Sequence, residues 1–141
     1  MIKNWIRTLF LAIILASCNS FEGPREIDWK KEWKENASKL KNLTREIIAN
    51  KEGKYKMGNN VFPDGFDYPF DEGFYIGYRH QDTLIDTNRI SIRYYVDRGL
   101  LDHFSAFIYT KDSTEIKELA FKVQQHAGDY KIEDNWYMVN D

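Results

Sequence analysis

The chain of 141 residues contains three histidines, and these are the first side chains to consider for metal chemistry. They are His80, His103 and His126, each 23 residues from the next. A zinc site usually includes a pair of ligands only a few residues apart, because one turn or helix must bring both to the ion. The histidines form no such pair. We therefore expect no metal and no cofactor, and we interpret the histidines as ordinary surface or edge residues.

Four carboxylates lie close together in the sequence and raise the possibility of calcium binding or of glycoside hydrolysis. They are Asp64, Asp67, Asp71 and Glu72. Calcium takes about six to eight oxygen ligands, and its common loop has a DxDxDG spacing that is missing here. A glycosidase needs two carboxyl groups about 5 Å or about 6.5–9.5 Å apart, a separation that a sequence does not reveal. We favour the interpretation that these acids are solvated loop residues.

Motifs for nucleophilic catalysis and for phosphate binding are missing. The sequence contains no GxSxG, no SxxK and no glycine-rich phosphate loop. A cysteine–histidine pair would depend on Cys18, which is the only cysteine. The small size of the chain also makes an enzyme less expected, so we leave catalysis open and lean against it.

Residues 62–78, FPDGFDYPFDEGFYIGY, form the best candidate for a binding surface. Tyrosine and phenylalanine give rigid contact area at low entropic cost, so this loop could stack on sugar rings or hold an anchor side chain from a protein. The same rings could instead cover one end of the core, and we favour that structural interpretation. The candidate binding residues are Phe62, Asp64, Phe66, Asp67, Tyr68 and Phe70.

Cys18 follows a segment with the layout of an export signal. Lys3 and Arg7 precede a block of nine residues without a charge, Thr8 to Ala16. A positive start and a short apolar block are typical of a secretory signal. A membrane-spanning helix needs about 20 apolar residues, so this block is too short to be a stable span.

The residues Leu15-Ala16-Ser17-Cys18 resemble the bacterial lipobox, in which a branched apolar residue and two small residues precede a cysteine. The resemblance implies a diacylglycerol on the Cys18 sulfur and cleavage between Ser17 and Cys18. An ordinary secretory signal that leaves Cys18 free is the alternative. Several acyl chains anchor firmly, because each buried methylene contributes about 0.8 kcal/mol. Asn19, where some Gram-negative lipoproteins carry an aspartate that retains them on the inner membrane, points toward the outer membrane.

Cleavage would leave a mildly acidic mature chain. Losing Lys3 and Arg7 leaves 18 basic and 22 acidic residues, a formal charge of −4, which argues against nucleic-acid binding. The whole chain has nine Phe, nine Tyr and four Trp, enough to build a core, so we do not expect disorder. The expected organisation is a signal peptide over residues 1–17, a tether over 18–25 and a single domain over 26–141.

Two segments have the periodicity of amphipathic helices. The first is Glu26 to Lys51, with Gly53 as the expected stop. The second is Asp112 to Ala127, where Asp112 and Glu115 resemble a capping box and Gly128 would stop the helix. The apolar face of the first contains Trp29, Trp33, Ala37, Leu40, Thr44 and Ile47, widened by Leu43 and Ile48; that of the second contains Ile116, Leu119, Ala120 and Val123. The two tryptophans could also form an exposed recognition stripe or lie at a lipid interface, but packing on a sheet is favoured.

Alternation along the chain predicts strands over residues 74–79, 90–97 and 103–109. The short connection over residues 97–102 predicts a hairpin, and a turn at Asp134-Asn135 precedes a last strand over 136–139. Residues 54–73 carry several turn signals, and we expect them to be irregular.

These elements predict an α+β fold, with a long N-terminal helix and a shorter C-terminal helix packed on one face of an antiparallel sheet. The arrangement resembles that of cystatin-like domains, and the ending DYKIEDNWYMVND resembles those of small uncharacterised envelope lipoproteins, which implies no activity. Our leading hypothesis is a membrane-anchored envelope lipoprotein without enzymatic activity that binds another protein as an inhibitor or immunity-type factor. The expected partners are therefore the lipid bilayer and an envelope protein. The alternative is binding of a carbohydrate or small ligand, or hydrolysis of envelope sugars, through residues 62–78.

Overall fold

The computed structural model describes residues 27–50, 53–77, 85–98 and 104–140, and the chain divides into two compact units, Met1–Glu32 and Trp33–Asp141. The first helix, α2 (Trp29–Ala49), begins in the first unit. The side chain of Asp28 accepts a hydrogen bond from the Lys31 amide at 3.2 Å, so it caps the helix, which begins three residues later than expected. Residues 1–26, which include the lipobox, Cys18 and the predicted tether, lie outside the described residues.

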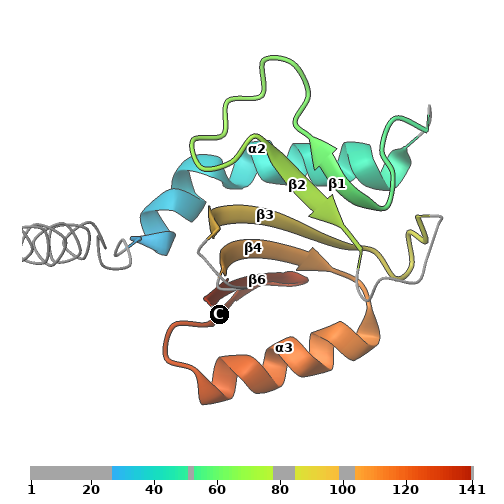
Figure 1. Ribbon diagram of the computed structural model, residues 1–141. Coiled ribbons are helices and arrows are strands. Elements are labelled where there is room, and N and C mark those ends of the chain that lie inside the picture. Colours follow the sequence, from blue (N-terminus) through green and yellow to red (C-terminus); the bar gives the residue numbers. More distant parts are fainter. Residues whose placement is uncertain (1–26, 51–52, 78–84, 99–103, 141) are drawn as a thin grey trace, which may run out of the picture. The chain divides into compact units, whose positions relative to one another are not determined.

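The second unit contains a six-stranded antiparallel sheet in the order β1-β2-β3-β4-β6-β5, drawn in Figure 1. The α+β class is confirmed, with a long helix before the first strand and a shorter helix between the fourth and fifth strands. The elements that follow α2 are β1 (Gly58–Val61), β2 (Gly73–Ile76), β3 (Ser91–Arg98), β4 (Phe104–Thr110), α3 (Ser113–Gln125), β5 (Tyr130–Glu133) and β6 (Trp136–Asn140).

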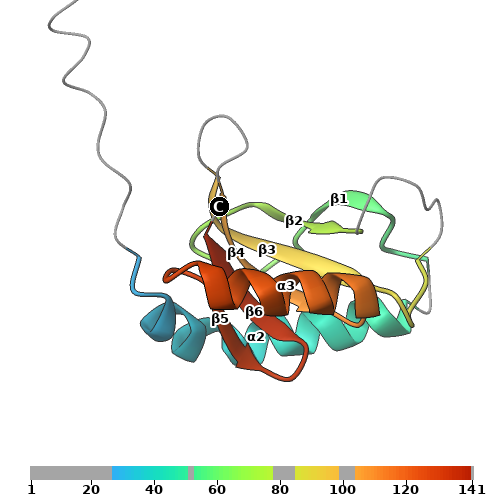
Figure 2. The same cartoon turned by 90° about the horizontal axis from the view of Figure 1, so that it is seen from below.

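The helices of the described residues, α2 and α3, lie on opposite faces of this sheet. The ring of Trp33 from α2 meets Phe107 and Trp136 at centroid distances of 5.1 and 4.9 Å. The neighbouring positions on β4 and β6 face the other way and pack with Leu119 of α3. Figures 1 and 2 show the sheet between α2 and α3. The expectation that both helices share one face is therefore wrong, because the central strands bury both of their sides. The cluster on the α3 side is Ala106, Ile108, Leu119, Tyr137 and Val139.

The predicted strands are confirmed as β2, β3, β4 and β6, and the turn at Asp134-Asn135 joins β5 to β6. β3 and β4 pair as antiparallel neighbours, although residues 99–103 lie outside the described residues. β1 lies in the segment that we expected to be irregular. It pairs with β2 so closely that a side chain at Gly73 would clash with the carbonyl group of Asn60. Gly73 of β2 therefore allows β1 to pair at this distance, although the sequence of β1, GNNV, does not itself predict a strand.

A buried hydrogen bond joins α2 to the sheet. The hydroxyl groups of Thr44 and Tyr94 lie 2.8 Å apart, and burial raises the pKa of Tyr94. Both side chains are buried, so neither hydroxyl can turn to solvent instead.

Replacing Tyr94 by phenylalanine should cost about 1–3 kcal/mol in the free energy of unfolding, because the Thr44 hydroxyl stays buried without its partner. Adding Thr44→Val removes that orphaned group and should recover most of the loss. Urea denaturation of the two single variants and the double variant measures this coupling. If the loss in the free energy of unfolding of the double variant equals the sum of the two single losses, the hydrogen bond between Thr44 and Tyr94 would be contradicted.

The start of α3 keeps only half of the predicted capping box. The Asp112 side chain accepts hydrogen bonds from the amides of Thr114 and Glu115, at 2.9 and 3.0 Å. The Asp112 amide instead donates to the Thr110 hydroxyl at 3.0 Å, while Glu115 turns inward. The helix ends at Gln125 with its cap, His126, in an extended conformation, so Gly128 does not supply the stop. Ala120, expected on the apolar face, is exposed.

Candidate functional site

The aromatic rings of the loop before β2 join it to the core through Phe62. The Phe62 ring stacks on Phe66 at 4.7 Å with 7° between the planes. It also meets the buried rings of Phe74 and Tyr94, at 5.2 and 6.3 Å. One face of the Phe66 ring is therefore occupied by another ring of the loop, and Phe62 serves mainly as core cover.

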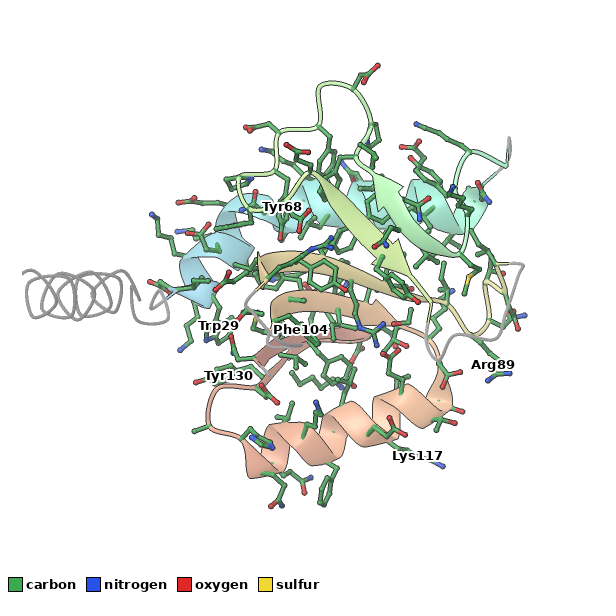
Figure 3. The ribbon with its side chains drawn as sticks, in the orientation of Figure 1. Trp29, Tyr68, Arg89, Phe104, Lys117 and Tyr130 are labelled. Carbon is green, nitrogen blue, oxygen red and sulfur yellow. The ribbon has the colours of Figure 1, made fainter. Side chains whose placement is uncertain are left out.

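Tyr68 and Phe70 are partly covered by other rings of the loop. Tyr68 is only 8% exposed, and its ring packs against Phe62 at 5.2 Å and against Phe70 at 5.4 Å. Figure 3 labels Tyr68 on the loop that precedes β2. Phe70 is half-buried. Of the four candidate rings, one is buried and three are half-buried, which favours the structural interpretation.

The acids of the loop are spread over different contacts. Asp64 and Asp67 are exposed, and the Lys39 ammonium of α2 lies 2.9 Å from the Asp67 carbonyl oxygen and 3.4 Å from its carboxylate. Asp71 accepts a hydrogen bond from the Gly73 amide at 3.1 Å and pairs with Arg98. Within the described ranges, no group of three or more His, Cys, Asp or Glu side chains is arranged to hold a metal ion.

The histidines add nothing that can be described as a site. His126 is the exposed C-cap of α3, while His80 and His103 lie outside the described residues.

Among the described residues, open grooves lie beside the loop against α2 and beside β1. Each has residues of the loop on one side, and neither is lined by Tyr68 or Phe70 in the described part of the chain. The groove against α2 has a volume of about 350 Å³ and is lined by Lys39, Asn42, Leu43, Glu46, Pro63, Asp64, Gly65 and Phe66. The groove beside β1 has a volume of about 730 Å³ and is lined by Lys54, Tyr55, Lys56 and residues 59–64.

Glu46, in the groove against α2, is held as a carboxylate. The Tyr55 hydroxyl donates to it at 2.7 Å and the Lys54 ammonium at 3.1 Å. Together these hydrogen bonds lower the pKa of Glu46, whereas burial raises the pKa of Tyr55. A general acid needs a pKa near the working pH, so Glu46 is poorly suited to donate a proton. The groove offers binding contacts more readily than acid catalysis.

A buried ion pair beneath α3 was missed in the sequence. The Arg93 guanidinium of β3 lies 2.8 Å from the Glu115 carboxylate and donates to the Gly77 carbonyl at 2.8 Å. Glu115 is 2% exposed, and burial raises its pKa although Arg93 and the hydroxyls of Ser91 and Thr110 oppose the shift. Its printed hydrogen-bond partner, Arg93, comes from the central strand β3, so the pair links α3 to the sheet.

A second ion pair lies at the same end of α3. Arg89 lies 3.0 Å from Asp112, and Figure 3 labels Arg89 near the start of α3. Burial alone would raise the pKa of Asp112. The hydrogen bonds from the Glu115 amide, Arg89 and the Thr114 amide have the larger combined effect, so the pKa of Asp112 is lowered.

Comparison of the chain with protein-family models, with curated proteins and with solved structures finds no match. No helix among the described residues is long and apolar enough to cross a membrane.

Proposed function

We propose that this chain is an exported bacterial lipoprotein, held on the cell envelope by lipid on Cys18, and that its folded part binds another protein without catalysing a reaction. The outer membrane is the proposed location. The observation that supports protein binding is the loop 62–70, whose rings hold it on the core while Asp64 and Asp67 face solvent.

A loop held in this way suits a macromolecular partner. Its shape is fixed by ring contacts before binding, so little side-chain and backbone entropy is lost when a partner docks. A small ligand normally has about 70–90% of its surface buried in a pocket, whereas the two grooves here are open. A protein surface can cover the loop and reach into both grooves at once.

Carbohydrate binding is a second candidate, and one groove supports it. The Phe66 ring, Asn42 and Glu46 line the groove against α2, which gives one ring and two polar groups for a sugar. Titration of the labelled protein with a soluble peptidoglycan digest, followed by NMR, tests this candidate. Saturable shifts at Asn42 and Phe66, lost in Phe66→Leu, would favour it over protein binding.

The anchor makes a separate prediction. The mass of the protein extracted from membranes should correspond to loss of residues 1–17 and gain of acyl chains. Cys18→Ser should prevent both changes, because serine lacks the thiol that takes the lipid. A Cys18→Ser protein that matures and fractionates with the membrane as the wild type does would exclude lipidation at this residue.

Partner binding is tested with two charge reversals on opposite sides of the second unit. Asp64→Arg changes the loop, and Lys117→Glu changes the face of α3 that points away from the sheet, as labelled in Figure 3. Proteins crosslinked to the wild type in detergent-solubilised envelopes are identified, purified and titrated against all three proteins. Asp64→Arg should weaken binding about tenfold and Lys117→Glu should change it less than about twofold. Equal affinities for both variants would contradict binding at the loop.

A further inference from the structure

The two edges of the sheet are unequal. β5 at one edge has an irregular register between Lys131 and Glu133, and Glu133 forms an ion pair with Lys41 of α2 at 2.6 Å. Bulges and charged side chains of this kind hinder the addition of another strand. β1 at the other edge pairs with β2 in unbroken register and has no charged residue in its sequence, GNNV. β1 is therefore the edge that lacks this protection (Figure 2).

The pairing of β1 with β2 shows which of its backbone groups face outward. The Phe62 amide donates to the Glu72 carbonyl at 3.1 Å, so this pair exchanges hydrogen bonds across the ladder. Hydrogen-bonded and non-hydrogen-bonded pairs alternate along antiparallel strands, so Asn60 also faces β2. The N–H and C=O groups of Asn59 and Val61 point the other way, where the described part of the chain has no further strand.

The groove of about 730 Å³ runs beside this edge. Lys54, Lys56 and Asp64 are the charged residues of its lining, and the Lys54 ammonium already pairs with Glu46 at 3.1 Å. Lys56 has no ion pair among the described residues, so it favours an acidic side chain on the occupant. Val61 is 77% exposed and offers an apolar contact to a residue placed opposite it on a neighbouring strand. Pairing of two copies of β1 would instead bring two lysine-bearing linings together.

We propose that an extended acidic segment of the partner protein adds to the sheet beside β1 as a further strand. This inference rests on the proposed protein-binding function and assigns its mode. The outward groups of Asn59 and Val61 alternate N–H and C=O at strand spacing, which an extended polypeptide matches residue by residue. Lys56 then meets an acidic side chain of the segment, and Val61 meets an apolar one.

The test variant is Val61→Pro, and its matched control is Val61→Thr. Proline removes the outward N–H of residue 61 and leaves every hydrogen bond between β1 and β2 in place, because that N–H does not face β2. Proline is tolerated in edge strands for this reason. Threonine keeps the N–H and the β-branched shape. Thermal unfolding of both variants at the wild-type midpoint establishes that the fold is retained.

The probe is a labelled eight-residue peptide of alternating valine and glutamate, measured by fluorescence anisotropy, together with the same peptide fully N-methylated on its backbone. The wild type and Val61→Thr should bind the first peptide equally. Val61→Pro should weaken binding about five- to tenfold, as expected for loss of one backbone hydrogen bond, and the N-methylated peptide should not bind. Failure of the first peptide to bind, or equal binding by Val61→Pro, would overturn strand addition.

Two further outcomes separate this inference from the proposed function. A purified partner that loses affinity for Asp64→Arg but binds Val61→Pro normally would overturn strand addition and leave protein binding intact. Concentration-dependent dimerisation of the wild type that Val61→Pro abolishes would show that a second copy covers the edge, and it would overturn the proposal of a partner segment.

Discussion

Arg93→Met is expected to destabilise the fold by about 3–5 kcal/mol at neutral pH, because it leaves Glu115 buried without its cationic partner. The guanidinium lies 2.8 Å from the carboxylate, and Arg93 itself is only 19% exposed, so solvent cannot readily replace it. Urea denaturation at pH 7 measures the change in the free energy of unfolding. A loss below about 1 kcal/mol would mean that Glu115 is already neutral or that water reaches it.

The double variant Arg93→Met with Glu115→Leu provides the control. Replacing both charges by apolar groups of similar volume is often neutral or stabilising, so this variant should unfold near the wild-type midpoint. A double variant no more stable than Arg93→Met would show that the helix-to-sheet packing, rather than the unpaired charge, causes the loss.

The deficit of Arg93→Met should also shrink on acidification. Burial raises the pKa of Glu115 in the folded protein above its usual value of 4.5. Folding therefore favours the protonated form of Glu115. The contribution of Glu115 to the free energy of unfolding is fully present below about pH 4.5, and it is lost as the pH rises through the pKa of Glu115 in the folded protein. Asp112 has a lowered pKa and acts in the opposite sense, losing its contribution as the pH falls. It is present in both proteins, so comparison of the variant with the wild type isolates Glu115.

Trp136→Ala should cost about 3–5 kcal/mol, the usual loss when a large buried aromatic residue is removed. Its ring meets Trp33, Tyr94 and Tyr109 at centroid distances of 4.9, 6.0 and 5.2 Å, so the cavity would open between α2 and the two central strands. Chemical denaturation measures the loss.

Phe121→Ala is the matched control for this aromatic truncation. Phe121 lies on α3 with 64% of its surface exposed, and its removal should change the free energy of unfolding by less than about 0.5 kcal/mol. Similar losses for Trp136→Ala and Phe121→Ala would contradict the assignment of Trp136 to the core.

The local elements of the fold were predictable because their periodicity is strong. Ile92, Tyr94 and Val96 alternate with more exposed residues along β3, as a strand with one strongly apolar side should. The arrangement of the helices was not predicted, although β6 carried a signal for it. Its four residues from Trp136 to Val139 are all buried, and a continuous apolar run in a strand indicates cover on both faces.

Features that depend on contacts distant in the sequence were not predictable. β1 reads as a polar turn, since Asn59-Asn60 favours turns, and only its pairing with β2 makes it a strand. Arg93 and Glu115 lie 22 residues apart on different elements, and nothing in their spacing links them. For the candidate site, the sequence identified the aromatic loop but not the burial of Tyr68, which depends on how Phe62 and Phe70 pack around it.

The ring contacts of Phe62 mark an inner side of the loop 62–70, where the fold limits which side chains are accepted. The outer side of the loop faces solvent and carries no such limit. Phe62 and Tyr68 must keep their rings, and Gly65, at φ +77°, occupies a backbone conformation that side chains rarely adopt. Asp64 and Asp67 lie outside these constraints. Both side chains are exposed, so they can be exchanged over a wide chemical range without loss of the scaffold, and one fold can carry surfaces of different charge and shape at this loop.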